Sequence, residues 1–471
     1  MIRIRHSAAL WLAVLLIPIS APASLSPFDY TALRDEAVQL LSQYLTINTS
    51  NPPGNELATA SWLKEVLARE GIEGQILDTA ELGPGRANFY ARLKGNGKKK
   101  AIALVHHMDV VPVTDSQWTV PAFQGFGEGR IRVWPRRDRH EGPRHHPAHG
   151  PDRDQTRRVS SSTGTWSYIA NADEEVNGDG AIIFVKRHPD LLQDVEYLLT
   201  EGADTRVEGG KVRWFGIDVG EKRPLWTRLV VEGKTSHGSV PIGDQNPVPR
   251  LARAIERVSA WQTPLRLTPA VERFFKALAT IETSPEGRKY LGDPRAALRS
   301  PAGRAWLLSE PERNALLRNT ISPTVLVGSN KTNTIPQRAT AELDIRLLPD
   351  EDPVAFTTEL RRIIADTSVK LEEIAPIPPR YDAPLDTELF KAIEHVAGEM
   401  LPGIPIATPV SPGASDRPSY AQAGIITYGL DPYLIPIEEN RYEVHGNDER
   451  LSIDNVGWGV KFYLLLLSGM R

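Results

Sequence analysis

Residues 100–112 decide the fold of this chain: Lys100-Ala-Ile-Ala-Leu-Val-His-His-Met-Asp-Val-Val-Pro112. The apolar run Ala101–Val105 is typical of a buried strand in a parallel sheet. Just past it stand His107 and Asp109, where open α/β sheets bind ligands and metals. A histidine in that place can bind a metal through one ring nitrogen while a carboxylate holds the other N–H. We therefore predict that His107 is a metal ligand and that Asp109 orients it. A structural histidine is the simpler interpretation of this stretch alone, but similar strand ends recur downstream.

The composition restricts the kind of metal site. The chain has 471 residues, a net charge of −4 and no cysteine. This length suits roughly two to three domains, and the charge does not indicate a nucleic-acid-binding protein. Without thiolates or disulfides, any metal must be held by histidine, aspartate and glutamate.

The amino terminus has the pattern of a secretion signal. Arg3 and Arg5 precede the apolar core 8–20, and Ala21-Pro22-Ala23 forms a small-residue cleavage site. We expect residues 1–23 to be removed and the protein to be secreted or periplasmic. We predict no stable membrane anchor, because this core and the apolar run 463–467 are too short to span a bilayer.

Alternating helices and strands predict a doubly wound α/β domain. Helical patterns cover 30–45, 58–70 and 455–470, and strand patterns cover 73–77, 88–93, 101–105, 168–172 and 195–200. A segment of different character interrupts this series. It has strands at 225–232 and 339–347 and helices at 247–261 and 270–282. We predict a catalytic domain at 24–223 and 349–471, with an inserted α+β domain at 224–348.

Carboxylates and a second histidine follow the later strands. Asp173-Glu174-Glu175 follows the strand at 168–172, and Glu201-Gly202 follows the strand at 195–200. His445 lies in a polar loop near the end of the chain. Each stretch by itself also fits an ordinary acidic or polar loop. Together they suit two zinc ions about 3.5–4 Å apart.

Motifs in order along nearly the whole mature chain resemble those of a known family. They are 51–56 (Asn-Pro-Pro-Gly-Asn-Glu), 106–112, 172–176, Glu201-Gly202, the loop around His237, 333–336 with 344–346, 412–416 and 445–450. The chain resembles the dizinc exo-metallopeptidases and deacylases that include aminoacylase, glutamate carboxypeptidase, acetylornithine deacetylase and succinyl-diaminopimelate desuccinylase. The resemblance implies that the inserted domain is a ferredoxin-like lid and dimerisation domain.

The resemblance also implies roles for individual residues. His107 and Glu201 would hold one zinc ion, and Glu175 and His445 the other; Co²⁺ or Mn²⁺ are alternatives to zinc. Glu174 would be the general base, acting on water whose pKa zinc lowers to about 7. His237 would stabilise the oxyanion, from the partner subunit of a homodimer. The free carboxylate of the substrate would be bound by Asn333, Arg346, Gly413, Ser415 and Asp416.

One motif of the family is absent. A Gly-Arg-Gly-Ala-x-Asp-x-Lys-Gly stretch, whose aspartate bridges both metals, is expected before Glu174. Residues 130–158 are instead rich in arginine, histidine and proline. Reading each codon from its second base allows residues 134–141 to become Gly-Arg-Gly-Ala-Ile-Asp-Met-Lys. We therefore predict that about 125–167 is translated out of frame, with the frame restored before Ile169. A histidine-rich metal patch and a basic nucleic-acid patch are alternatives. Asp138 is the nearest replacement for the missing aspartate.

The sequence thus predicts an enzyme that hydrolyses an amide bond next to a free carboxylate and releases an amino acid. A carboxypeptidase or dipeptidase is the main prediction, acting on small peptides. An N-acyl-amino-acid deacylase is the alternative. A metal-poor pseudoenzyme is a third reading, because loss of the bridging aspartate should weaken metal binding and activity.

Overall fold

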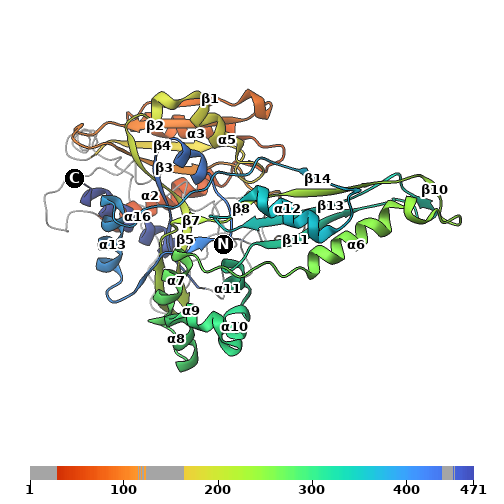
Figure 1. Cartoon of the computed structure of the whole chain (residues 1–471). Coiled ribbons are helices and arrows are strands. Elements are labelled where there is room, and N and C mark those ends of the chain that lie inside the picture. The colour runs from red at the N-terminus through yellow and green to blue at the C-terminus, as the bar shows by residue number, and fades with distance from the viewer. Residues whose placement is uncertain are drawn as a thin grey trace. The chain divides into compact units, whose positions relative to one another are not determined.

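The computed structural model describes residues 29–114, 116, 118, 121–123, 164–436, 449 and 451–470 (Figure 1). It divides into two compact units. The first consists of the described parts of Met1–Val219, Ala383–Thr408 and Ser415–Arg471, and the second of Gly220–Asp382 and Pro409–Ala414. The second unit is therefore an insertion into the first, as the sequence predicts.

The first unit is built on a mixed sheet that has eight strands in the described part of the chain. Their order is β1 (Gly74–Asp78), β2 (Ala87–Leu93), β4 (Trp166–Asn171), β3 (Ala101–His107), β5 (Val195–Glu208), β6 (Lys211–Gly216) and β15 (Ile406–Ala407), with β17 (Ile426–Pro436) also paired to β5. The central strands β4, β3, β5 and β17 are parallel neighbours. The pairs β1–β2, β2–β4 and β5–β6 are antiparallel. The carboxyl ends of the parallel strands therefore meet at one edge.

Helices cover both faces of this sheet, which confirms the doubly wound prediction. On one face, alternate residues of β3 pack with Phe184 of α5 (Asp179–Arg187) and Tyr420 of α14 (Arg417–Gln422). On the other face, the ring of His106 lies 6.1 Å from that of Tyr44 in α2 (Tyr30–Tyr44). The remaining helices of this unit are α3 (Glu56–Arg69), α13 (Glu388–Met400) and α16 (Ile453–Gly469), with short turns η1 (Ala80–Leu82) and η3 (Pro189–Leu192). Burial on both faces explains why β3 is apolar without alternation.

Several strand bounds differ from the predicted ones, and three of them lie near the predicted site: β3 continues to His107, and β4 and β5 also differ. β4 begins at Trp166, and both Trp166 and Ser167 are paired and buried within the sheet. β5 does not end before Glu201 but continues to Glu208. Its register against β17 shifts beyond Thr200, so Glu201 lies at a bulge rather than after the strand. A bulge bends the strand and re-aims the side chain it carries.

The second unit is an antiparallel sheet covered by helices. The strand order is β11 (Thr320–Val327), β13 (Arg338–Leu347), β9 (Thr227–Glu232) and β14 (Val369–Glu373), with β8 (Arg223–Pro224) paired to the end of β13. Ala341, Leu343 and Ile345 of β13 are buried as their alternation predicts. They join a core with α6 (Pro247–Ala260) and α12 (Pro353–Ile364). The predicted range 224–348 covers β9 to β13, whereas α12 and β14 lie beyond it.

The remaining elements of the second unit are short. Small strand pairs are β7 (Gly220–Glu221) with β16 (Val410–Ser411), and β10 (Ser236–His237) with β12 (Thr334–Ile335). A one-turn η4 (Gly243–Gln245) precedes α6. A helical group follows α6: α7 (Pro269–Ala279), α8 (Pro285–Gly292), α9 (Pro294–Arg299), α10 (Pro301–Leu308) and α11 (Pro311–Leu316). Proline at the first turn of each of these five helices fits that position, because its missing N–H has no helical partner there.

None of the helices in the described ranges is long and apolar enough to cross a bilayer. The predicted signal segment 1–23 lies outside those ranges, as does 125–163.

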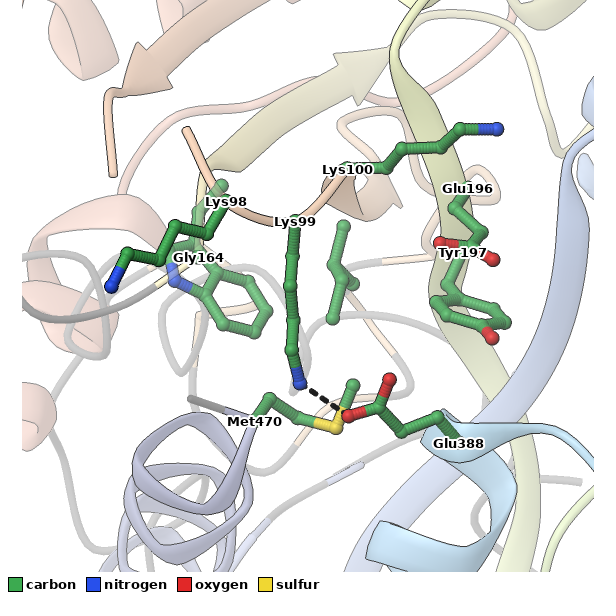
Figure 2. A pocket seen from close by; sticks show the side chains of 10 residues that line it. Lys98, Lys99, Lys100, Gly164, Glu196, Tyr197, Glu388 and Met470 are labelled. Carbon is green, nitrogen blue, oxygen red and sulfur yellow. Dashed lines mark hydrogen bonds and ion pairs between the residues drawn. The ribbon is translucent and has the colours of Figure 1, made fainter. Parts of the chain in front are cut away.

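A pocket of about 270 Å³ lies where β3, β4 and β5 begin (Figure 2). Lys98, Lys99 and Lys100 contribute to its lining together with Trp166 and Glu388, and Lys99 pairs with Glu388. This pocket lies at the amino ends of the parallel strands. It is therefore distinct from the strand edge where the sequence predicts the metal site.

Candidate metal centre

His107 is the last residue of β3 and is 3 % exposed. Its Nδ1 lies 2.9 Å from the carbonyl oxygen and 3.2 Å from the Oδ1 of Asp109. Both partners accept hydrogen bonds, so Nδ1 carries the donated proton. The other ring nitrogen, Nε2, is buried without a hydrogen-bond partner among the described residues. The predicted arrangement of a histidine oriented by Asp109 is therefore present.

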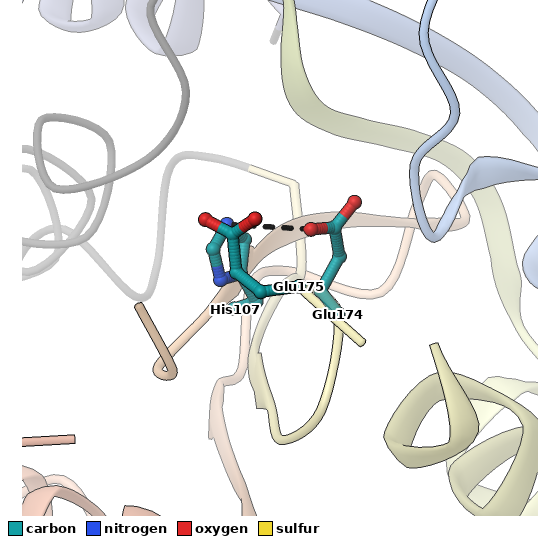
Figure 3. Close-up of side chains that lie close together, drawn as sticks. All are labelled: His107, Glu174 and Glu175. Carbon is teal, nitrogen blue, oxygen red and sulfur yellow. Dashed lines mark ion pairs between the residues drawn. The ribbon is translucent and has the colours of Figure 1, made fainter. Parts of the chain in front are cut away.

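Glu174 and Glu175 follow β4 and converge on His107 (Figure 3). One ligand atom from each of the three side chains lies within 4.8 Å of the others. His107 Nε2 is 3.9 Å from Glu174 Oε2. The Asp109 carboxylate accepts hydrogen bonds from the backbone N–H groups of Glu174 and Glu175 at 3.1 Å each, and these bonds hold the turn that carries the two glutamates. The aspartate that orients the histidine thus also holds the two glutamates.

Glu201 adds a further carboxylate close to His107. It is 5 % exposed, and its Oε2 is buried without a hydrogen-bond partner in the described part of the chain. Burial lowers the pKa of His107, but the charges of Asp109, Glu174 and Glu201 outweigh burial and raise this pKa well above the usual value. These carboxylates therefore favour a positive charge at the imidazole.

The residues fit a divalent metal. An imidazole nitrogen and a carboxylate oxygen are each buried without a partner, and a bound cation would satisfy both. These are the nitrogen and oxygen donors expected of a chain without cysteine. His445 and Asp138 lie outside the described residues.

The predicted substrate-binding loop 413–416 is divided between the two units. Asp416, in the first unit, is 5 % exposed and accepts a 2.8 Å hydrogen bond from Asn171 Nδ2. Burial raises the pKa of Asp416 to about 7, and the nearby charges of Asp109 and Glu201 add to this. Ser415 Oγ accepts a 2.9 Å hydrogen bond from Arg417 Nε. Gly413, in the second unit, donates its N–H to Ser411 Oγ at 3.2 Å.

His237 and Asn333 lie side by side in the second unit. β10 pairs with β12, and the N–H of Gly238 donates to the carbonyl oxygen of Asn333 at 2.7 Å. His237 is exposed, and its Nδ1 accepts the backbone N–H of Ser239 at 3.2 Å. Its neutral tautomer therefore carries the proton on Nε2. That N–H is the group an oxyanion would require.

Arg346 lies near the carboxyl end of β13, apart from the β10–β12 pair. Its Nε donates to Asp344 Oδ1 at 2.7 Å, and its guanidinium carbon lies 5.7 Å from the centre of the Trp226 ring. Trp226 Nε1 also donates to Asp344, at 3.0 Å. Asp344 therefore orients Arg346, and the arginine stays partly exposed.

The structure adds four buried residues that the sequence did not identify as part of the site. They are Asn51, Glu56, Arg86 and Asp173, which form a hydrogen-bonded network behind Asp109. Asn51 and Glu56 belong to the turn motif 51–56, and Asp173 belongs to the motif 172–176, but neither motif indicated a role for these three residues. Arg86 lies outside all the motifs.

Known proteins resemble the chain in both units. The Peptidase dimerisation domain family matches residues 219–372. The N-fatty-acyl-amino acid synthase/hydrolase PM20D1 of Xenopus tropicalis is 25 % identical over 391 residues, covering 77 % of this chain and 71 % of that protein. Aminoacylase-1 of Mus musculus is 25 % identical, covering 92 % of this chain and 95 % of its own length.

A solved structure shows the same fold. The M20 family metallo-carboxypeptidase Sso-CP2 from Sulfolobus solfataricus superposes with a TM-score of 0.63 at 17 % identity, covering 94 % of this chain and 100 % of that one. The inserted α+β domain and the doubly wound sheet predicted from sequence are therefore confirmed.

Proposed function

Because the chain belongs to the M20 family of metallopeptidases and acylases, we propose that it hydrolyses an amide bond next to a free carboxylate and releases an amino acid. One observation carries this proposal. His107, Glu174 and Glu175 converge at the carboxyl ends of β3 and β4, with His107 Nε2 and Glu201 Oε2 buried and unsatisfied in the described part of the chain. We propose a peptide substrate, cleaved in the manner of a carboxypeptidase or dipeptidase.

We propose a separate role for each residue of the site. His107 and Glu201 would hold one zinc ion, and Glu175 with His445 a second. The metals would supply a polarised carbonyl and activated water at neutral pH. Glu174, whose carboxylate lies 3.9 Å from His107 Nε2, would take the proton from the attacking water and deliver it to the leaving amine. Asp109 would keep the imidazole in the tautomer that leaves Nε2 free.

Four of the six proposed substrate contacts lie in the second unit, and Ser415 and Asp416 lie in the first. The Nε2–H of His237 suits a developing oxyanion, and Asn333 lies beside it. Arg346, held by Asp344, suits a carboxylate because its guanidinium offers two parallel donors. Gly413, Ser415 and Asp416 complete the proposed set.

The second unit would also form a homodimer. Its edge strand β11 exposes Val325, Leu326 and Val327, with Leu326 69 % exposed. Exposed apolar strand edges bind other chains unless they are covered. We propose that a second copy covers β11, which agrees with the dimerisation-domain match.

A deacylase acting on N-acyl amino acids is the second candidate. The curated relatives that favour it are PM20D1 and aminoacylase-1, which span most of this chain. Both candidates are tested by incubating the protein with a panel of dipeptides and N-acyl amino acids. The release of free amine is measured with and without added Zn²⁺. Metal-dependent release from neither class would contradict the proposed function.

We further propose that about 125–167 is translated out of frame, with the frame restored before Ile169. In the shifted frame, the codon of the missing bridging aspartate consists of the last two bases of the Arg139 codon and the first base of the His140 codon. Resequencing the gene tests this, and a frame-restored chain should bind more zinc and turn over faster than the present one. An in-frame read that still encodes Trp134-Pro135-Arg136 would end the proposal.

The proposed enzyme would act outside the cytoplasm. The amino-terminal signal pattern supports a secreted or periplasmic location. Sequencing the amino terminus of exported protein tests this, with cleavage after Ala23 as the expected result.

A further inference from the structure

A single buried amide joins the two halves of the candidate metal centre. Asn51 is 3 % exposed, and its Nδ2 donates to Asp109 Oδ2 at 2.8 Å and to Asp173 Oδ1 at 2.9 Å. The amide nitrogen has two hydrogens, and each is directed at a carboxylate. Asn51 is itself fixed, because its backbone N–H donates to the carbonyl oxygen of Val110 at 2.8 Å.

The two carboxylates that Asn51 joins control different ligands. Asp109 orients His107 at the end of β3. Asp173 immediately precedes Glu174 and Glu175 and has a φ of +67°, a left-handed conformation that costs about 1–3 kcal/mol for a residue other than glycine. The hydrogen bonds to Asp173 hold this turn in place. The Asn51 side chain therefore fixes the histidine relative to the glutamate pair.

Charge explains why the linking residue is a neutral donor. Asp109 and Asp173 are 0 % and 4 % exposed, so each needs hydrogen-bond donors. Arg86 Nη2 supplies one to Asp173 at 2.9 Å, but Arg86 is also shared with the fully buried Glu56, at 2.5 and 2.8 Å. An acidic residue at position 51 would face two carboxylates, and an apolar one would leave both short of a donor.

We propose that Asn51 is a positioning residue of the metal centre: it sets the separation of His107 from Glu174 and Glu175, and with it the affinity of the site for divalent metal. This inference rests on the proposed metal-dependent function. Mutation of a residue that hydrogen-bonds to a metal ligand usually changes the metal affinity by 10–100-fold.

The test compares the parent full-length chain with Asn51→Leu and Asn51→Asp, which keep nearly the same shape but remove the donors. Asn55→Ala is the matched control, because Asn55 lies in the same turn, is exposed, and bonds only weakly to the carbonyl oxygen of Asn48, at 3.3 Å. Co²⁺ affinity is measured by chelator competition, and the Co²⁺ absorption band reports coordination geometry. Circular dichroism and metal-free melting follow the fold, with Asn51→Ser as the milder variant if Asn51→Leu loses structure.

We expect Co²⁺ affinity to fall about 10-fold or more in both Asn51 variants, with a changed absorption band, and to stay at the parent value in Asn55→Ala. A purely structural role would lower the metal-free melting temperature but leave affinity and spectrum unchanged, which would overturn the inference. A parent chain that binds no Co²⁺ or Zn²⁺ would instead overturn the proposed metal site, and this inference with it.

Discussion

Acidification should destabilise this protein through a histidine that is not a metal ligand. His106 immediately precedes the predicted ligand but lies on the other face of β3 and is 1 % exposed. Its Nδ1 is 2.8 Å from the carbonyl oxygen of His107, so Nδ1 must carry the proton. Its Nε2 therefore accepts from the Tyr168 hydroxyl at 2.7 Å. Both nitrogens are satisfied only in the neutral ring.

The size of the effect follows from the two pKa values. Burial lowers the pKa of His106 to about 3, whereas an exposed histidine in the unfolded chain titrates near 6.5. Between these values the unfolded state binds one proton more than the folded state. Stability therefore falls as pH falls through this window. The loss approaches about 1.4 kcal/mol per pH unit and amounts to about 2.3 kcal/mol between pH 6.5 and 4.5, because the unfolded histidine is only half protonated at pH 6.5.

Urea unfolding at half-unit steps from pH 7 to pH 4.5, on the parent and on His106→Asn, measures this contribution. Asparagine keeps a donor near the position of Nδ1 but does not titrate. The difference in unfolding free energy between the two proteins should shrink by about 2.5 kcal/mol over this range. Parallel pH curves for the two proteins would refute the assignment of a neutral, buried His106.

Three further substitutions probe the site and its support. Gly202→Ala should cost about 2–4 kcal/mol in urea unfolding, because its Cβ would lie 2.3 Å from the backbone of β17. Gly398→Ala is the control: its Cβ has open space within helix α13, so it should stabilise the protein by up to about 1 kcal/mol. Arg86→Met should cost about 3–5 kcal/mol by leaving Glu56 charged and buried, and adding Glu56→Gln should recover much of the loss. Glu201→Gln should lower the zinc retained after dialysis while the metal-free melting temperature holds or rises; unchanged zinc content would remove Glu201 from the ligand set.

Local signals were sufficient for the parts of the site that lie at strand ends. The apolar run before His107 predicts a buried parallel strand, and the polar residues after such strands converge because parallel strands end at one edge. This reasoning predicts that His107, Glu174 and Glu175 lie close together, and in the structure their side chains do. The alternation of apolar and polar residues along β13 likewise predicted which face of the strand is buried.

The parts that sequence reasoning missed depend on pairing between distant segments. β5 was expected to stop before Glu201 because glutamate and glycine usually end a strand, but pairing with β17 extends it. Asn51 and Asp173 are 122 residues apart, and their hydrogen bond has no periodicity to reveal it. Side-chain networks of this kind are fixed only once the fold has brought the chain segments together.

The charges of the network connect metal binding to the fold. Asp109, Asp173 and Glu56 are buried carboxylates, and among the described residues that bond to them the fixed positive charge comes from Arg86. Glu201 adds another buried carboxylate close enough to act on His107. A buried cluster with more carboxylates than cations is costly unless protons or metal ions neutralise it. The same carboxylates raise the pKa of His107, because a proton on the ring supplies part of that positive charge. A divalent ion would replace this proton and supply more charge at the same place. The excess of buried carboxylates would therefore give the site affinity for metal.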